Sequence, residues 1–459
     1  MICHGQLKLG LLVGLAALAW PIAAGAQAPL TSEPPPPAVQ PQVDDPMLAP
    51  PEAAPAEVKS WDEAIDMIRR SPDFLTSAAQ VDRALAQHRV ALAAVLPQLF
   101  AQGAYEHNFK TLSVPFDGAT LVAPPPTVWS IAGTLEWNIL SPRAIYGLGT
   151  SDIATDIATL SLADRKRVLA GSVISALLAT LAAERVAELD RVGLRAALER
   201  LVLTQTRLKF ARGTELDVDR AQQDVAAARA ALISGDESLR QAREALGQAL
   251  GSATPLAAPA SLDLEGFERA VATTCRINAD VDHRADVVAA RARVELADRQ
   301  INDVKLQFAP TLGVNAEAGY ASASTLGPNT TIELGATLTI PLYDGGARYG
   351  QLRDAKASAL QARDELTSVR IAAMIENARA QRAVSVDTAS RDVAKEQRDL
   401  AQRVDTRTRE GYIAGVGTSL DLVTSAQALR AAEINLVLLD FQLAQARAGA
   451  VLSNAECMF

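Results

Sequence analysis

Proline placement is the feature of this sequence that most constrains its fold. None of the 23 prolines lies between Pro142 and Pro255, and none follows Pro341. A proline inside an α-helix costs about 3 kcal/mol, because its ring clashes with the preceding turn and it has no N–H to donate. The two proline-free tracts, 143–254 and 342–459, therefore predict very long helices.

Each proline-free tract contains one glycine break, at 210–218 and at 412–422, which predicts a sharp turn between paired helices. A helix from Arg143 to Ala211 would be about 100 Å long at 1.5 Å per residue, far longer than a globular domain needs. Since aromatic residues make up only 4% of the chain, the pattern argues against a compact enzyme core. The candidate turn residues are Gly213, Gly415 and Gly417.

The N-terminus predicts an export signal followed by an extended segment. Lys8 precedes an apolar run from Leu9 to Trp20, and Ala24–Ala26 suits a cleavage site, so we assign 1–26 as a signal peptide. Residues 27–59 hold ten of the 23 prolines and are predicted to form a disordered tether. No later run approaches the ~18 apolar residues of a membrane helix, so any membrane role would fall to strands.

The rest of the chain is predicted to be a tandem repeat. "TLEWNILSPRAIYG" from Thr134 matches "TLTIPLYDGGARYG" 203 residues later, and Gly213 matches Gly415 at an offset of 202. Asp73 and Pro97 bound a helical stretch whose counterpart lies 213 residues later. Near-constant offsets over so long a stretch indicate a duplication. The boundaries that we assign are 60–254 for the first repeat, 255–282 for the linker, 283–452 for the second repeat and 453–459 for a C-terminal tail.

Each repeat contains two segments of alternating apolar and polar residues, which predict β-strands. In "WSIAGTLEWNI" every second residue from Trp129 is apolar or glycine, and strands of ~9–11 residues with one apolar face are typical of membrane barrels. Trp129 and Trp137 share that face about 20 Å apart along the membrane normal, as two aromatic girdles require. The strands are predicted at about 98–106, 128–140, 311–320 and 331–342. The girdle candidates are Tyr105, Trp129, Trp137 and Tyr320.

Four such strands cannot close a barrel, and open sheet edges are not tolerated in lipid. The chain is therefore predicted to oligomerise. Two chains would give eight strands, whose interior side chains fill, and three would give twelve, which leave a bore. The residues alone favour three chains only if a conduit is required.

The order and duplication of these segments resemble the TolC-like outer-membrane efflux family. The resemblance runs from Trp61 to the C-terminal helix and rests on "SPDF", "LPQLFAQGAY", "APTLGVNAEAGY", "PLYDGG" and "GTSLDL". It implies an α+β membrane protein of two repeats, each with two transmembrane β-strands and long coiled α-helices. It also implies a homotrimer, with a 12-stranded barrel in the outer membrane of a Gram-negative bacterium and a 12-helix periplasmic tunnel. Substrates would arrive from an inner-membrane RND or ABC transporter through a periplasmic adaptor protein.

The same resemblance places the glycine breaks at the periplasmic tip of the tunnel, where acidic residues ring the entrance. Asp421 matches the first acidic position after the second turn, whereas Thr424 stands where a second is common. In the first repeat Asp217 matches in type, and Asp219 lies beside it. Crowded like charges in a narrow bore would repel anions, attract cations and raise one another's pKa values. The alternative is that Asp217 and Asp421 only cap the returning helices.

By this resemblance, the strand-to-helix junctions are the points where the barrel becomes the tunnel. Pro341 removes a hydrogen-bond donor where strand pairing should end, and Asp344 can cap the helix that follows. Gly345 and Gly346 supply flexibility, whereas the first repeat makes the same bend with Pro142 in the first helical turn.

No constellation of residues predicts catalysis, a cofactor or a metal site. The four histidines form no ligand cluster, and the net charge of −9 argues against a nucleic-acid partner. After the signal the chain has two cysteines, Cys275 and Cys457, too few for a zinc site or a disulfide scaffold. In an oxidising periplasm the two could nevertheless pair.

We therefore predict a passive exit duct that conducts small molecules or drugs, with outer-membrane lipid around its strands. Family frequency favours efflux with a proton-driven pump over a type I protein-secretion duct. A prediction of another class is a non-transporting periplasmic coiled-coil scaffold, in which the four strands would be soluble. Fractionation with outer membranes as a trimer would distinguish the duct from the scaffold.

Overall fold

The computed structural model describes residues 43–116, 119–259, 264–323 and 329–459. The signal peptide predicted at 1–26 and the first part of the predicted tether lie outside the described residues.

Two very long helices dominate the described chain, as the proline-free tracts predict. They are α3 (Pro142–Lys209) and α7 (Ala347–Ala414), each of 68 residues. Each turns back into a shorter antiparallel partner, α4 (Glu215–Ala249) and α8 (Ser419–Leu452) respectively. The predicted helix from Arg143 to Ala211 is confirmed to within two residues at its C-terminal end.

Two further helices lead into the sheet. Helix α2 (Pro72–Ala93) packs on α3, and α6 (Ala285–Leu306) packs on both α3 and α7. Pro97 and Pro310 follow these helices and precede the next strands, because a proline ends helical hydrogen bonding and tolerates an extended backbone.

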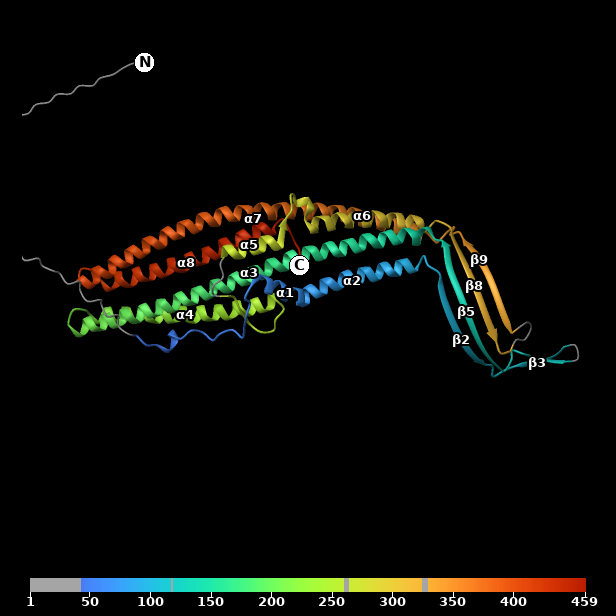
Figure 1. Ribbon diagram of the computed structural model, residues 1–459, viewed down its shortest axis with the longest axis horizontal. Coiled ribbons are helices and arrows are strands. Elements are labelled where there is room, and N and C mark those ends of the chain that lie inside the picture. The colour runs from blue at the N-terminus through green and yellow to red at the C-terminus, as the bar shows by residue number, and fades with distance from the viewer. Residues whose placement is uncertain (1–42, 117–118, 260–263, 324–328) are drawn as a thin grey trace, which may run out of the picture. The chain divides into compact units, whose positions relative to one another are not determined.

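One antiparallel four-stranded sheet continues from the helices, in the order β2-β5-β8-β9 (Figure 1). Its strands are β2 (Gln98–His107), β5 (Thr127–Leu140), β8 (Thr311–Ala321) and β9 (Thr330–Thr339). Strand β9 ends three residues before the predicted boundary at 342, because Pro341 has no N–H for the ladder. Strands β2 and β9 pair on one side only, so the sheet has two open edges.

The connection between β2 and β5 contains a hairpin that the sequence reasoning did not anticipate. It consists of β3 (Leu112–Phe116) and β4 (Ala119–Ala123), paired antiparallel in a sheet of their own. The longer connection of the first repeat thus forms secondary structure beyond the end of the main sheet (Figure 1).

The prediction of a disordered tether from 27 to 59 is wrong for residues 43–59. This stretch contains a short 3-10 helix, η1 (Pro46–Leu48), and strand β1 (Ala56–Glu57), which pairs in parallel with β6 (Leu256–Ala257). Val58 is 1% exposed in the main hydrophobic core. The prolines suit an extended path, but the apolar residues between them find a partner surface on the long helices.

The largest hydrophobic core lies midway along the helices and joins segments that are remote in sequence. Helix α1 (Trp61–Arg70) begins at its N-cap Ser60 and buries Trp61 against Phe267 of α5 (Leu264–Thr274). Residues of α3 from Leu169 to Leu181 and the end of α8 complete this cluster. Both repeats and the linker therefore pack together in one core, midway along the helices.

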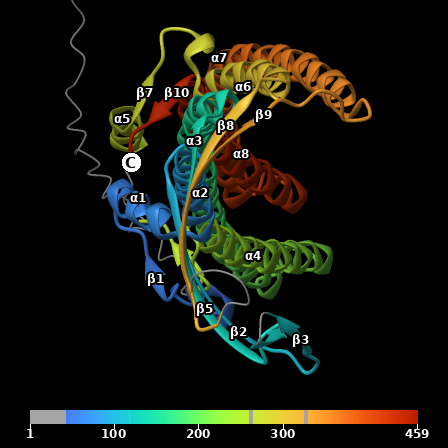
Figure 2. The ribbon, with the colours of Figure 1, turned by 90° about the vertical axis from the view of Figure 1, so that its right-hand side faces the viewer.

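The C-terminal tail is ordered and covalently linked to the linker. Strand β10 (Ala455–Cys457) pairs antiparallel with β7 (Cys275–Ile277), and Cys275 and Cys457 form a disulfide. In Figure 2, β7 and β10 lie together beside α5. A short 3-10 helix, η2 (Val281–His283), then leads into α6. The pairing that the sequence left open is thus present.

Two helices, α3 and α8, each contain an 18-residue window that is long and apolar enough to cross a membrane by length and composition. By length and composition, these two helices correct the prediction that no segment after the signal approaches a membrane span. Of the α3 window, 56% is buried inside the protein, as expected for a helix that passes through the main core.

Candidate functional site: helix turns, junctions and sheet face

The two turns at the helix ends remote from the sheet share one construction. Arg212 N–H donates to the carbonyl of Arg207 at 2.9 Å, and Val416 N–H donates to that of Gly411 at 3.0 Å. These are the six-to-one hydrogen bonds of Schellman motifs, which satisfy carbonyls at the end of a helix. The returning helices therefore leave both turns in the same way.

A capping box begins each returning helix. Thr214 accepts from the Asp217 N–H and Asp217 accepts from the Thr214 N–H, and Thr418 and Asp421 repeat the pattern 204 residues later. The aspartates therefore take part in capping the returning helices, but from the third helical position, because Thr214 and Thr418 occupy the N-cap.

The left-handed residue that closes each turn is different in the two repeats. Gly415 has φ +84°, and the equivalent position in the first turn is Ala211, with φ +56°. Gly213 corresponds to Gly417 rather than to Gly415, so the offset of 202 inferred from sequence is wrong by two residues. Glycine alone adopts this conformation without a Cβ penalty.

We expect opposite stability changes from exchanging alanine and glycine at these two positions. Ala211→Gly should raise the free energy of unfolding by about 0.5–1 kcal/mol, because it relieves a left-handed alanine, and Gly415→Ala should lower it by about 1–2 kcal/mol. Thermal midpoints followed by circular dichroism in detergent measure both changes. Two shifts of the same sign would contradict the assignment of these positions.

The candidate aperture carboxylates differ in their surroundings. Asp421 is exposed, and its hydrogen bonds from the Thr418 side chain and backbone lower its pKa. Burial alone would raise the pKa of Asp217, but hydrogen bonds from Ser419 and Thr214 outweigh it, and that pKa is also lowered. Asp219 is exposed in the second turn of α4. Both capping aspartates are therefore ionised at neutral pH in the single chain.

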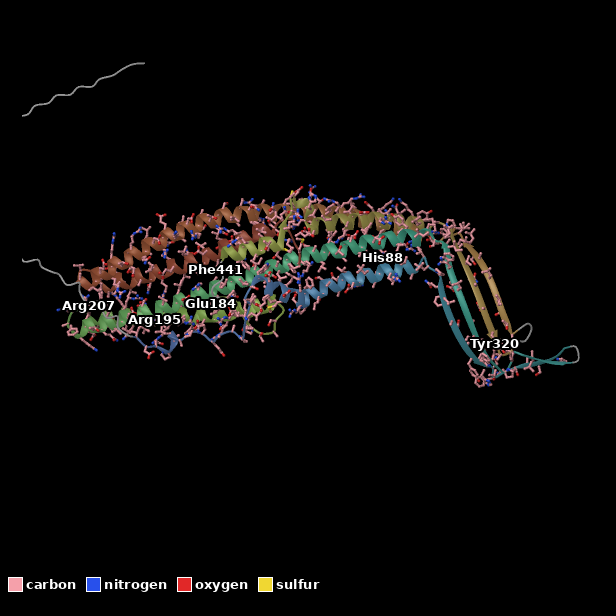
Figure 3. All side chains as sticks on the ribbon, in the orientation of Figure 1. His88, Glu184, Arg195, Arg207, Tyr320 and Phe441 are labelled. Atoms are coloured by element: carbon pink, nitrogen blue, oxygen red, sulfur yellow. A yellow bond between two sulfur atoms is a disulfide. The ribbon has the colours of Figure 1, made fainter. Side chains whose placement is uncertain are left out.

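Polar contacts that no pattern in the sequence predicts join the two turns. The Arg207 guanidinium donates to the Tyr412 carbonyl and lies over the Tyr412 ring, with the Cζ 4.4 Å from the ring centroid. The Ser419 hydroxyl donates to Asp217. Figure 3 shows Arg207 at the end of the helices remote from the sheet. Neither spacing nor composition relates residues 200 positions apart, so only the fold brings them together.

A buried carboxylate, that of Asp224, makes further contacts between helices beyond the turns. The Asp224 side chain is fully buried, accepts two bonds from Arg200 of α3, and accepts from Gln427 of α8 at 3.0 Å. A buried charge is stable only when it is paired and hydrogen-bonded. Asp224 therefore fixes α4 to α3 and to α8 at one level.

The second strand-to-helix junction is built around Asp344, as the sequence predicts. Its carboxylate accepts from the backbone N–H groups of Gly346 and Arg348, and Gly345 and Gly346 have φ +72° and +91°. The buried Arg348 side chain, which the sequence reasoning missed, donates to Asp344 at 2.7 Å and to the Gln307 carbonyl at 3.1 Å. The start of α7 is thus fastened to the end of α6.

The first junction uses other residues for the same connection. Ser141 caps α3, with Pro142 in the first turn where no N–H donor is needed. Arg143 then makes a bidentate ion pair with Asp303 of α6, at 3.1 to 3.2 Å. Both long helices therefore begin with an arginine contact to α6.

Strand register places the predicted apolar residues on one continuous face. Trp129 pairs with Tyr105, and Ile131 pairs with Tyr320, so the three rings lie near the loop end of that face. The Trp129 and Tyr320 ring centroids are 5.4 Å apart, and Figure 3 shows Tyr320 at the far end of the strands. Trp137 lies at the helix end, where its indole N–H donates to the Val95 carbonyl at 3.1 Å.

The opposite face of the sheet carries the polar residues. Glu317 pairs directly with Glu333, and Glu136 pairs with Asn315. Phe100 is an exception, because it pairs with Thr134 on this face. One apolar and one polar face across four strands is the pattern that lipid on one side and water on the other would favour.

Within the described ranges, no group of three or more His, Cys, Asp or Glu side chains could hold a metal ion. The site is therefore a set of mechanical and electrostatic contacts at the two ends of the helices.

Long paired helices that run into a four-stranded sheet are also the fold of solved outer-membrane proteins. The outer membrane protein VceC from Vibrio cholerae shares this fold at a TM-score of 0.69 and 19% identity, over 86% of this chain and 96% of that one. The family model "Outer membrane efflux protein" matches residues 66–252 and 278–449. The chain belongs to the outer membrane efflux protein family, as the resemblance predicted.

Two curated relatives are similar to the chain over part of their length. The outer membrane efflux protein BepC of Brucella suis is 25% identical over 55% of this chain and 56% of its own. The alkaline protease secretion protein AprF of Pseudomonas aeruginosa is 26% identical over 60% of this chain and 59% of its own. The match thus spans less than two thirds of either relative.

Proposed function

We propose that the protein is the outer-membrane exit duct of a tripartite efflux system and conducts small molecules or drugs passively. The observation that carries the proposal is the open four-stranded sheet. Its exposed apolar face suits lipid, and its two unpaired edges require strands from other chains, because lipid offers no hydrogen bonds to backbone groups. A periplasmic adaptor and an inner-membrane RND or ABC transporter would supply substrate and energy.

A trimer is the assembly that we propose. Three copies would give twelve strands, enough for a water-filled bore, whereas eight strands are filled by their own side chains. Helix α7 supports association through its exposed apolar residues, several of which recur at heptad spacing on one face. They include Leu360, Ile371, Ile375, Val386, Val393, Leu400 and Val404. Neighbouring chains would cover this stripe.

In this assembly the turns would form the periplasmic aperture, with Asp421 as its acidic ring and with Asp217 and Asp219 as further candidates. Three Asp421 carboxylates around a narrow bore would attract cations and repel anions. Asp421 lies exposed beside the turn, with its charge stabilised by Thr418, and is thus available to face a bore.

Single-channel conductance in planar lipid bilayers tests the duct and its aperture together. We expect Asp421→Asn to keep the capping hydrogen bonds, since an amide oxygen also accepts, but to weaken block by multivalent cations at least severalfold. Asp421→Ala should weaken the block equally and also loosen the turn. Unchanged conductance and unchanged block in both variants would reject the aperture, and the absence of any channel in the wild type would reject the duct.

A type I protein-secretion duct is a second candidate, favoured by the name of the relative AprF. The two candidates differ in cargo and not in the geometry of the duct. Deleting the gene should raise sensitivity to small toxic compounds if the duct serves efflux, and should remove a protein from the medium if it serves secretion.

A further inference from the structure

The segment Asp45–Glu52, here called the strap, lies along the helix pair α3–α4 (Figure 1). The buried Asp45 accepts from Arg229 of α4 at 2.7 Å, and its other carboxylate oxygen caps η1 through the Met47 N–H. Arg191 of α3 donates to the Ala49 carbonyl at 3.2 Å, and Arg243 of α4 donates to the Glu52 carbonyl at 2.9 Å. Three arginines on two helices thus hold one extended segment.

Apolar contacts lie between these polar ones. Met47 and Leu48 pack on a cluster separate from the main core, formed where α3 faces α4. The buried members of this cluster are Leu194, Ala197, Val225, Ala228 and Leu232, and Leu198 and Leu201 pack against it. The α3–α4 groove, defined by these residues with Arg229, therefore combines an apolar floor with one cationic anchor.

The second helix pair keeps apolar residues at the α4 positions of this cluster, as Leu429, Ala432 and Leu436, but differs at the anchor and along the first helix. At the 204-residue offset that the capping boxes define, Glu433 occupies the position of Arg229, which reverses the anchoring charge. The positions of Leu194, Leu198 and Leu201 are occupied by Arg398, Gln402 and Asp405. The duplicated helices have thus diverged at Arg229, which pairs with the strap, and at leucines that belong to or pack against the cluster under Met47 and Leu48.

We propose that the α3–α4 groove is a binding site for an extended peptide segment, and that the strap is its resident ligand. The ligand class is a segment with a carboxylate two residues before an apolar pair, as in Asp45, Met47 and Leu48. Because the strap is tethered in the same chain, its high effective concentration excludes a partner segment of the same chemistry.

Release of the strap from the groove does not depend on the proposed duct and can be measured without a transport assay. Asp45→Arg and Arg229→Glu, made in the full chain, should both release the strap, because each places like charges together. Hydrogen exchange at Met47 and Leu48, whose N–H groups are bonded to Asp45, should become at least tenfold faster in both. Leu48→Asp provides a third released chain if one charge reversal fails to fold.

A fluorescent peptide of residues 43–58 then probes the groove in trans by anisotropy, with the full chain in detergent. The wild-type chain should not bind it, because the strap fills the groove. The Asp45→Arg chain should bind it saturably, because its groove retains Arg229, and the Arg229→Glu chain should not. Three results would overturn the proposal. They are slow exchange in both variants, equal peptide binding to the wild-type, Asp45→Arg and Arg229→Glu chains, and no peptide binding to the Asp45→Arg chain.

Discussion

Replacing Ile332 by arginine should prevent assembly of the protein in the outer membrane. Ile332 is 83% exposed on the apolar face of β9, in register with Ala318 and, through it, Gly133, midway between Trp129 and Trp137 on the same face. An arginine at the bilayer midplane costs a lipid-facing strand about 2–4 kcal/mol. A trimer would carry that cost three times, so we expect loss of heat-resistant trimers on gels and loss of outer-membrane fractionation.

The neighbouring substitution Glu333→Arg is the matched control. It introduces the same side chain one residue away on the polar face, where it would meet Glu317 and remove a like-charge pair. Assembly should therefore be retained. If both variants assembled like the wild type, the apolar face would not meet lipid, and the periplasmic scaffold would become the better interpretation.

Removing the Cys275–Cys457 disulfide should give the largest loss of folding stability. The bond closes a loop across a sequence separation of 182 residues, and the chain-entropy description of cross-links gives an upper value of about 5 kcal/mol for a loop of this size. We expect the Cys275→Ala, Cys457→Ala double variant to unfold at a clearly lower temperature, measured by circular dichroism in detergent.

Reductant added to the folded wild-type protein provides the control. Cys275 and Cys457 are 0% and 2% exposed, so reduction should be slow until the protein opens. Two free thiols in protein isolated from membranes, or a double variant with an unchanged thermal midpoint, would show that the cross-link does not stabilise the native chain.

The sequence predicted the elements of the fold because their signals are local. Proline interrupts helices, and its absence from 143–254 and 342–459 permits α3 and α7. Period-two alternation in β5 and β9 fixed the apolar face, and the register of four strands confirms it. Asp344 was identifiable because a helix start needs an acceptor for its free N–H groups. Pro142 was identifiable because the first helical turn needs no N–H donor.

Contacts between distant segments were not predictable in this way. The strap was misjudged because proline content predicts an extended backbone and does not reveal that Met47 and Leu48 have a groove to fill. The left-handed Ala211 was missed because glycine is the usual signal for that conformation, and Gly213 lies two residues away. The tie from Arg207 to Tyr412 depends on how two helix pairs lie together, which no spacing in the sequence encodes.

Each long helix is held at its sheet end by one of the two junctions. Arg143 with Asp303, and Arg348 with the Gln307 carbonyl, fix α3 and α7 to α6 where they leave the sheet. A helix of 68 residues is about 100 Å long, so a tilt of about one degree at its support displaces the far turn by about 2 Å. Such a displacement is comparable to the reach of the Arg207 and Ser419 hydrogen bonds that join the turns. Small rotations of α3 or α7 at the sheet end would therefore strain the few hydrogen bonds that join the turns.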